Sequence, residues 1–116
     1  MTDSERKYAA WCAVHEPHRF YIWSHWLKIR RHVLNMDKGE CQICKQNYHR
    51  FKRADTVHHV NHFKQRPDLA LEIYYTDPVT HEQKRNLISV CRECHEVLHE
   101  RRTIENSAAL TIERWD

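Results

Sequence analysis

The chain has 116 residues, of which 41% are hydrophobic and 30% are charged, so it is long enough for one globular domain and too apolar for disorder. Nineteen basic side chains against sixteen acidic ones give a net charge of only +3, which excludes a strongly basic or acidic protein. No apolar run approaches the ~18 residues of a membrane-spanning helix, and the polar start MTDSERKYAA is unlike a secretory signal. We therefore expect a cytoplasmic protein with no membrane partner, in which cysteines are thiols or metal ligands rather than disulfides.

The first predicted element is an amphipathic helix. Residues 1–19 show no clear periodicity and are expected to form an N-terminal extension. After them, apolar residues recur every three or four positions, which predicts one buried helix face. Gly39 stands where a residue with positive φ is expected to end this helix. The positions of the apolar face are Ile22, Trp26, Ile29, Val33 and Met36.

The second half of the chain predicts a short strand or hairpin, a loop and a final helix. In ADTVHHVNHF, the β-branched Thr56 and Val57 favour the strand or hairpin. QRPDLALEIYYTDPVTHEQK contains two prolines and predicts a loop, with a turn of helix at residues 69–72. Residues 91–102 predict a helix, which is followed by a polar tail. The predicted divisions are an extension (1–19), one domain (20–103) and a C-terminal tail (104–116).

Four of the five cysteines predict a structural zinc site. Cys41 and Cys44 form one C-x-x-C pair, and Cys91 and Cys94 form a second. The two-residue gap lets both thiolates of a pair turn toward one tetrahedral ion, and two pairs complete a four-sulfur site. A thioredoxin-like redox pair would explain one C-x-x-C and leave the other without a role. Cys12 is expected to be a buried or free thiol.

The segment CRECH also matches the C-x-x-C-H signature of covalent haem attachment. Haem attachment normally takes place outside the cytoplasm, and this chain shows no export signal. It would also leave Cys41 and Cys44 unused. We therefore expect no haem.

Histidines predict a second metal site. His95 and His99 lie four residues apart on a predicted helix, so they share one face, whereas Cys94 points about 100° away from His95. A reactive metal needs at least one further ligand, for which the pair His58-His59 is the candidate. Consecutive side chains of an extended segment diverge, so one should bind metal and the other should act beside it.

The order of these motifs resembles that of the HNH endonucleases. CQIC, VHHV and NLISVCRECHEVLH follow one another as in that family, and WLKIRRHVLNMDKGECQIC resembles the segment that leads into its zinc-stapled members. The likeness covers roughly residues 23–100. It implies an α+β fold with a small ββα-metal core, in which a hairpin and a helix surround one divalent ion. An amphipathic helix precedes this core, and a four-cysteine zinc site staples it.

The resemblance also implies a role for each motif residue. His58 matches the first metal ligand and His59 the general base. Asn86 matches the middle letter of the motif, whose side chain fixes the hairpin loop and so orients the base. His95 and His99 match the remaining ligands of the catalytic metal. Where many relatives have glycines between the histidine pair and the asparagine, this chain has the longer insertion ALEIYYTDPVTHEQK.

The activity implied by the resemblance is hydrolysis of DNA phosphodiester bonds, by nicking or by double-strand cleavage. A divalent ion on the histidines would neutralise charge that builds on the phosphate, and three neutral ligands permit Mg²⁺, Mn²⁺, Ni²⁺ or Zn²⁺. Double-stranded DNA is the expected partner, and cutting both strands implies either a dimer or sequential nicks. A short zinc-stapled chain of this kind is compatible with a phage origin.

A local excess of positive charge predicts contacts with nucleic acid. Residues 45–66 contain six lysines and arginines but one acidic residue, which favours attraction of a polyanion. The alternative to a nuclease is a non-catalytic zinc-stapled module that binds nucleic acid through this surface, and it would have no use for His59. The contacts predicted by position are Lys52, Arg53, Lys64, Arg66, Lys84 and Arg85.

Overall fold

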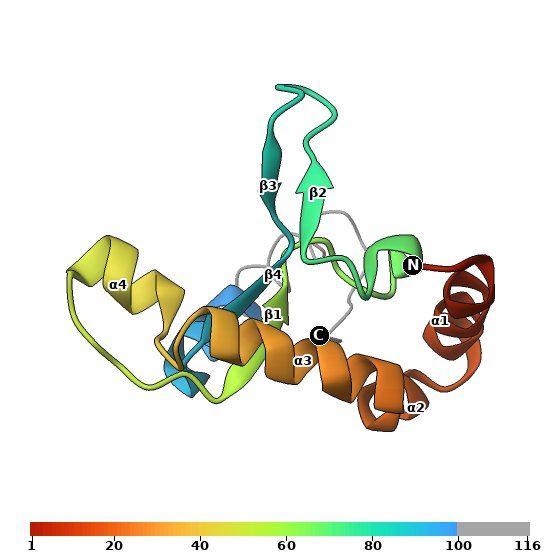
Figure 1. Cartoon of the computed structure of the whole chain (residues 1–116), viewed down its shortest axis with the longest axis horizontal. Helices are drawn as coiled ribbons and strands as arrows, with labels where there is room; N and C mark the ends of the chain where they lie inside the picture. The colour runs from red at the N-terminus through yellow and green to blue at the C-terminus, as the bar shows by residue number, and fades with distance from the viewer. Residues whose placement is uncertain (100–116) are drawn as a thin grey trace.

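The computed structural model describes residues 1–99, in which helices surround one small antiparallel strand pair and a second pair projects from the body of the protein (Figure 1). The predicted tail 104–116 and the end of the predicted last helix lie outside these residues. None of the helices within residues 1–99 is both long and apolar enough to cross a membrane. In chain order the elements are α1 (Asp3–His15), α2 (Pro17–Ile22), α3 (Ser24–Met36), α4 (Gln42–Tyr48), β1 (Thr56–His59), the 3-10 turn η1 (Pro67–Leu69), β2 (Tyr74–Thr76), β3 (Gln83–Arg85), β4 (Leu87–Val90) and a helix over residues 92–99.

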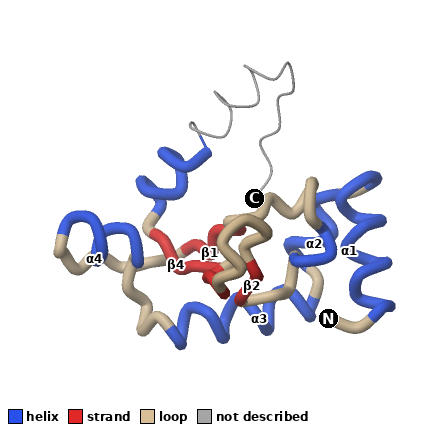
Figure 2. The backbone as a smooth tube through the Cα atoms, turned by 90° about the horizontal axis from the view of Figure 1, so that it is seen from above, coloured by secondary structure: helices blue, strands red, loops and turns tan. Residues whose placement is uncertain are grey.

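The centre of the fold is a ββα unit. Strand β1 pairs antiparallel with β4, in a register that sets His58 opposite Ile88 and His59 opposite Leu87. The helix of residues 92–99 follows β4 after a single residue. Figure 2 shows the β1–β4 pair between this helix and α3. The predicted α+β fold, with a small strand pair and helix preceded by another helix, is confirmed.

Helix α3 carries the predicted apolar face at its centre. Trp26 and Val33 are buried, as the spacing predicted. Ile22 and Met36, at the ends of the predicted face, are exposed, and Ile22 belongs to α2 instead. The chain ends the helix with two residues of positive φ, one of which is Gly39 at +68°. The prediction for Gly39 is therefore confirmed.

Helices α1 and α2 were not predicted. A capping box begins α1, in which Thr2 and Glu5 each bond the backbone N–H of the other. The buried face of α1 is made of the small residues Ala9, Cys12 and Ala13, so its hydrophobic periodicity is weak. Phe20 of α2 is fully buried in the same core. The T-x-x-E spacing is the sequence signal that could have located α1.

The prediction of a loop after residue 66 was wrong in part. Strands β2 and β3 form a hairpin that projects from the body of the protein (Figure 1). The Asp77 side chain accepts the backbone N–H groups of Val79 and Thr80, which stabilises the turn between the strands. Each strand is three residues long and most of its side chains are exposed, so no apolar alternation marked the hairpin. The single-turn η1, Pro67–Leu69, shares only Leu69 with the helical turn predicted at residues 69–72.

A bidentate ion pair ties this hairpin to α3. The Arg85 guanidinium donates to both carboxylate oxygens of Asp37, at 3.1 and 2.9 Å. The same carboxylate accepts the backbone N–H of Ser89 at 3.1 Å, and only 8% of Asp37 is exposed. Burial alone would raise the pKa of Asp37, but the hydrogen bonds from Arg85 and Ser89 outweigh burial and lower it.

An Arg85→Ala variant should be less stable by about 2–4 kcal/mol, because it leaves the buried Asp37 carboxylate without its counterion. The lowered pKa means that the stabilisation exists above the ordinary aspartate range near ~4 and is lost as the pH falls through the folded-state pKa. Urea unfolding of the zinc-loaded wild type, Arg85→Ala, Asp37→Asn and the double variant at pH 7 measures the coupling between the two side chains. An Arg85→Ala variant as stable as the wild type, or a double variant whose loss is the sum of the two single losses, would contradict this origin of the stability.

Candidate functional site

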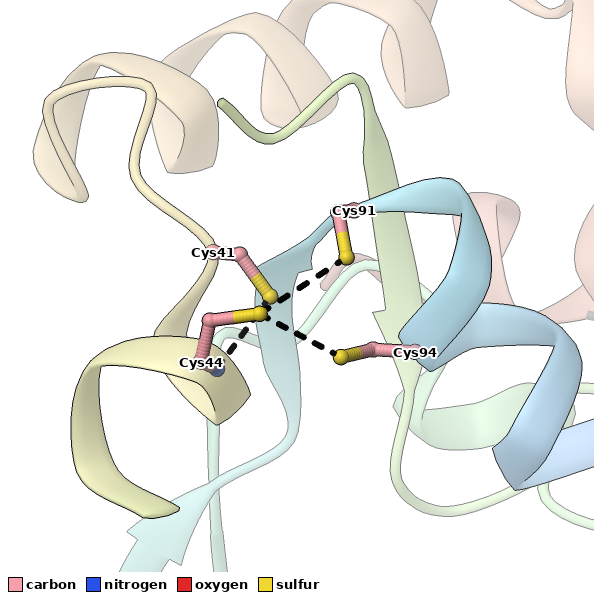
Figure 3. A group of neighbouring side chains, drawn as sticks. All are labelled: Cys41, Cys44, Cys91 and Cys94. Atoms are coloured by element: carbon pink, nitrogen blue, oxygen red, sulfur yellow. Dashed lines mark hydrogen bonds between the residues drawn. The ribbon is translucent and has the colours of Figure 1, made fainter. Parts of the chain in front are cut away.

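Four cysteines from two distant segments meet at one point (Figure 3). Cys41 immediately precedes α4, which contains Cys44, whereas Cys91 follows β4 and Cys94 lies in the helix after it. Their sulfur atoms all lie within 4.8 Å of one another. The Sγ of Cys44 is 3.9 Å from that of Cys91 and 3.6 Å from that of Cys94. A tetrahedral zinc ion with bonds of about 2.3 Å sets sulfurs about 3.8 Å apart, so the cluster fits zinc.

The electrostatics of the cluster also favour a cation. Burial raises the pKa of the Cys91 thiol, and burial with the neighbouring sulfurs raises that of Cys94. Burial opposes ionisation of Cys41 as well, but N–H groups of Cys44 and Cys91 lower its pKa. One of these, the Cys44 N–H, lies 3.5 Å from the Cys41 sulfur. Four thiolates at this spacing repel one another, and a divalent cation removes that repulsion.

The three predicted histidine ligands form a chain of neighbouring rings. The ring centroid of His58, on β1, is 5.7 Å from that of His95, and the centroids of His95 and His99 are 4.4 Å apart. His58 is 3% exposed, and the other two are half-buried. With metal–nitrogen bonds of about 2.1 Å, imidazole centroids on one ion lie roughly 4.5–5.5 Å apart. The two observed separations, 5.7 and 4.4 Å, fall just outside this range, and the ligand roles stay a prediction.

His59 lies in the aromatic core and is fully buried. Its ring stacks on Trp26, with centroids 4.7 Å apart and planes 25° apart, and it also contacts Phe20 and Phe63. Its Nε2 is 3.0 Å from the backbone oxygen of Ala70. A carbonyl oxygen only accepts, so Nε2 must donate, and in a neutral imidazole the lone pair then lies on Nδ1.

Asn86 holds the loop that supplies this carbonyl. The side-chain oxygen of Asn86 accepts the backbone N–H of Asn61 at 3.0 Å and its amide at 2.9 Å. The side-chain nitrogen donates to the backbone oxygens of Leu69 at 2.8 Å and Glu72 at 2.9 Å. Ala70 lies between these two anchored residues. Asn86 is fully buried, and its geometry suits the predicted role of orienting His59.

Ion pairs occupy most of the basic residues that were predicted to contact nucleic acid. Arg85 is half-buried and already bound to Asp37 and to the Leu87 carbonyl, which is a structural arrangement. The other pairs are exposed, so each is worth little and can exchange its partner for a phosphate. Arg53 is exposed. The pairs are Lys52–Glu93 at 2.8 Å, Arg66–Asp68 at 2.9 Å, Lys84–Asp77 at 3.0 Å and Arg85–Asp37 at 2.9 Å.

Three residues near His59 and Asn86 make contacts that no sequence pattern indicated. Trp26 was predicted to be a core residue, and nothing in the sequence indicated that it stacks on His59. Ala70 acts through its backbone oxygen, which no side-chain pattern reveals. Asn61 acts as a partner of Asn86, 25 residues away in sequence. Contacts of this kind depend on how the chain folds back.

Comparison with known proteins bears on the fold of the chain. No protein-family model matches the sequence, and no curated protein matches it significantly. Among solved structures, the chain matches the crystal structure of an HNH endonuclease from the deep-sea thermophilic bacteriophage GVE2, determined with manganese. The TM-score is 0.51 and the identity is 24%, over 89% of this chain and 95% of that chain. An identity at this level shows a shared fold and nothing more. The protein therefore has the fold of an HNH endonuclease, with a four-cysteine cluster that can hold a metal.

Proposed function

We propose that the protein is a metal-dependent endonuclease that hydrolyses DNA phosphodiester bonds. The observation that carries the proposal is the arrangement of four imidazoles around the ββα unit. Three of them, on His58, His95 and His99, are neighbours, with ring centroids 5.7 Å apart for His58 and His95 and 4.4 Å apart for His95 and His99. The fourth belongs to His59, which follows His58 in β1. The fold shared with the HNH endonuclease of phage GVE2, whose structure contains manganese, agrees with this use of the histidines.

The metal and the base would have separate tasks. His58, His95 and His99 would hold a divalent cation, which when bound supplies positive charge beside the phosphate. The structural zinc would be held by the four cysteines and take no part in the reaction. The chain keeps the two sets of ligands apart because sulfur and imidazole leave the last helix on different faces.

His59 would act on the attacking water. Its Nδ1 takes a proton from water as the water oxygen bonds to phosphorus, and the bond from phosphorus to the 3′ oxygen breaks. The products are a 5′-phosphate and, after protonation, a 3′-hydroxyl. The Ala70 carbonyl holds Nε2–H and stabilises the imidazolium that forms. Because His59 is fully buried in the free protein, substrate binding must expose the Nδ1 edge of its ring.

Cleavage of supercoiled plasmid tests the proposal. The wild type should nick or linearise plasmid when Mg²⁺, Mn²⁺, Ni²⁺ or Zn²⁺ is added, and not when the metal is omitted. A His95→Ala variant should cut at least about a hundredfold more slowly, because it loses a metal ligand. His32→Ala is the matched control, since His32 is an exposed histidine on α3 and far from the ligands in sequence.

The opposite outcome supports a different function. Complete burial of His59 is the observation that favours a non-catalytic zinc-stapled module. Such a module would bind plasmid and leave it intact with all four metals. Binding without cutting would therefore refute the nuclease and support the module.

A further inference from the structure

A second surface with nucleic-acid chemistry lies beside the cysteine cluster. Residues 48–53, YHRFKR, form a turn that we call the aromatic-basic loop. Tyr48 is 63% exposed and Phe51 is 71% exposed. The Arg50 guanidinium lies 5.8 Å from the centre of the Tyr48 ring. Residues 41–54 contain four lysines and arginines and no acidic residue.

The cysteine cluster anchors this loop from both sides. Helix α4 ends at His49, whose φ of 49° turns the chain into the loop. The Arg50 N–H donates to the Cys44 carbonyl at 3.3 Å, and the Cys41 N–H donates to the Lys52 carbonyl at 2.7 Å. Both cysteines belong to the four-sulfur site. The loop is therefore held in a defined path while its two aromatic rings face solvent.

A cavity of about 320 Å³ lies next to the loop, between α4 and the helix of residues 92–99. Its size is at the lower end of the range for ligand pockets. Cys94, Val97 and Leu98 line it from that helix, on a different face from His95 and His99. The walls combine apolar residues with basic ones and one acidic residue, Glu93, which pairs with Lys52 at 2.8 Å. They include Ile43, Tyr48, Arg50, Lys52, Glu93, Val97 and Leu98.

We propose that the aromatic-basic loop binds a nucleic-acid strand with unpaired bases, outside the proposed cleavage site. An exposed apolar side chain is ordinary on its own. Two exposed aromatic rings interleaved with basic residues are the arrangement that stacks bases and contacts phosphates in single-strand binding. Paired bases hide their faces in the duplex stack, so the rings suit a strand whose bases are open. The inference rests on the proposed function only in taking nucleic acid as the ligand.

Fluorescence anisotropy with a labelled 12-nucleotide single strand, and with the same sequence as a blunt duplex, tests this surface. The full chain is used with zinc bound and no other divalent metal. The Tyr48→Ala/Phe51→Ala double variant should bind the single strand at least about tenfold more weakly, with a smaller loss on the duplex. Its salt dependence should match that of the wild type, because no phosphate contact is removed. Tyr48→Phe/Phe51→Trp should restore the affinity.

Two further variants separate stacking from charge. Trp11→Ala is the matched control, because Trp11 is also an exposed aromatic residue, at 42%. The Arg19 guanidinium lies 5.7 Å from the centre of its ring, much as Arg50 lies over the Tyr48 ring. The Trp11→Ala variant should bind as the wild type does. Arg50→Gln/Arg53→Gln should lower the slope of log affinity against log salt by about 1.4, the value for two phosphate contacts on a single strand.

The inference is overturned if the Tyr48→Ala/Phe51→Ala variant, with its zinc content and melting temperature unchanged, binds the single strand as tightly as the wild type. An equal loss in Trp11→Ala would also overturn it. The binding assay measures affinity and does not depend on cutting, so a failure of plasmid cleavage would refute the nuclease and leave this result intact. If the Tyr48→Ala/Phe51→Ala variant binds the single strand like the wild type and still cuts plasmid, only the proposed role of the aromatic-basic loop is refuted.

Discussion

A Cys91→Ser variant is expected to lose its zinc and to be unfolded at room temperature. Binding of a structural zinc ion contributes on the order of 10 kcal/mol, which is similar to the whole stability of a small domain. Cys91 is 2% exposed and belongs to a small buried cluster. Besides Cys41, Cys44 and Cys91, the buried residues of this cluster are Ala54 and Val90. Elemental analysis for zinc and circular dichroism during heating measure the two effects.

Two other variants show whether the loss is specific to this metal. Cys12→Ala removes a fully buried cysteine outside the cluster, and should keep its zinc and lose only about 1–2 kcal/mol. His95→Ala should stay folded and keep its zinc. If His95→Ala also unfolds, the histidines belong to the structural site and the interpretation with two metals fails. A Cys91→Ser variant that keeps its zinc and melts like the wild type would refute the zinc site itself.

Replacement of His59 by glutamine should slow metal-dependent cutting by about 10²–10⁴-fold while the chain stays folded. Glutamine is close to histidine in volume, and its amide can donate to the Ala70 carbonyl in place of Nε2–H. The amide does not take a proton from water near neutral pH. His59→Ala would lose activity as well, but it would leave a cavity against Trp26 and lower stability by about 2–4 kcal/mol.

The control for His59 disturbs the same core and keeps the imidazole. Phe63 is fully buried against His59, so Phe63→Leu should lower the melting temperature. Below that temperature it should keep most of the cutting activity. Plasmid cleavage and thermal melting of the wild type and both variants are compared at one metal concentration. A His59→Gln variant that cuts as fast as the wild type would make His59 a core residue and leave the base to be found elsewhere.

The sequence predicted the features that depend only on the spacing of residues along the chain. Two C-x-x-C pairs predicted the sulfur cluster because a two-residue gap lets both sulfurs turn to one ion, and the structure brings all four together. The three- and four-residue steps around Trp26 and Val33 predicted the buried face of α3. Helix α1 was not predicted because its buried positions are small residues. The β2–β3 hairpin was not predicted because most of its side chains are exposed.

The sequence by itself determined the four-cysteine cluster, because the spacing of the two C-x-x-C pairs brings their sulfurs to one point. The spacing of Cys94, His95 and His99 likewise predicts that sulfur and imidazole leave one helix on different faces. Only the tertiary structure decided where His59 lies. Alternation along β1 predicted that it diverges from His58, but its burial against Trp26 and its bond to Ala70 depend on a loop that Asn86 anchors. The ion pair between Asp37 and Arg85 also depends on the tertiary structure. Asp37 and Arg85 are 48 residues apart, and only folding brings such partners within reach of each other.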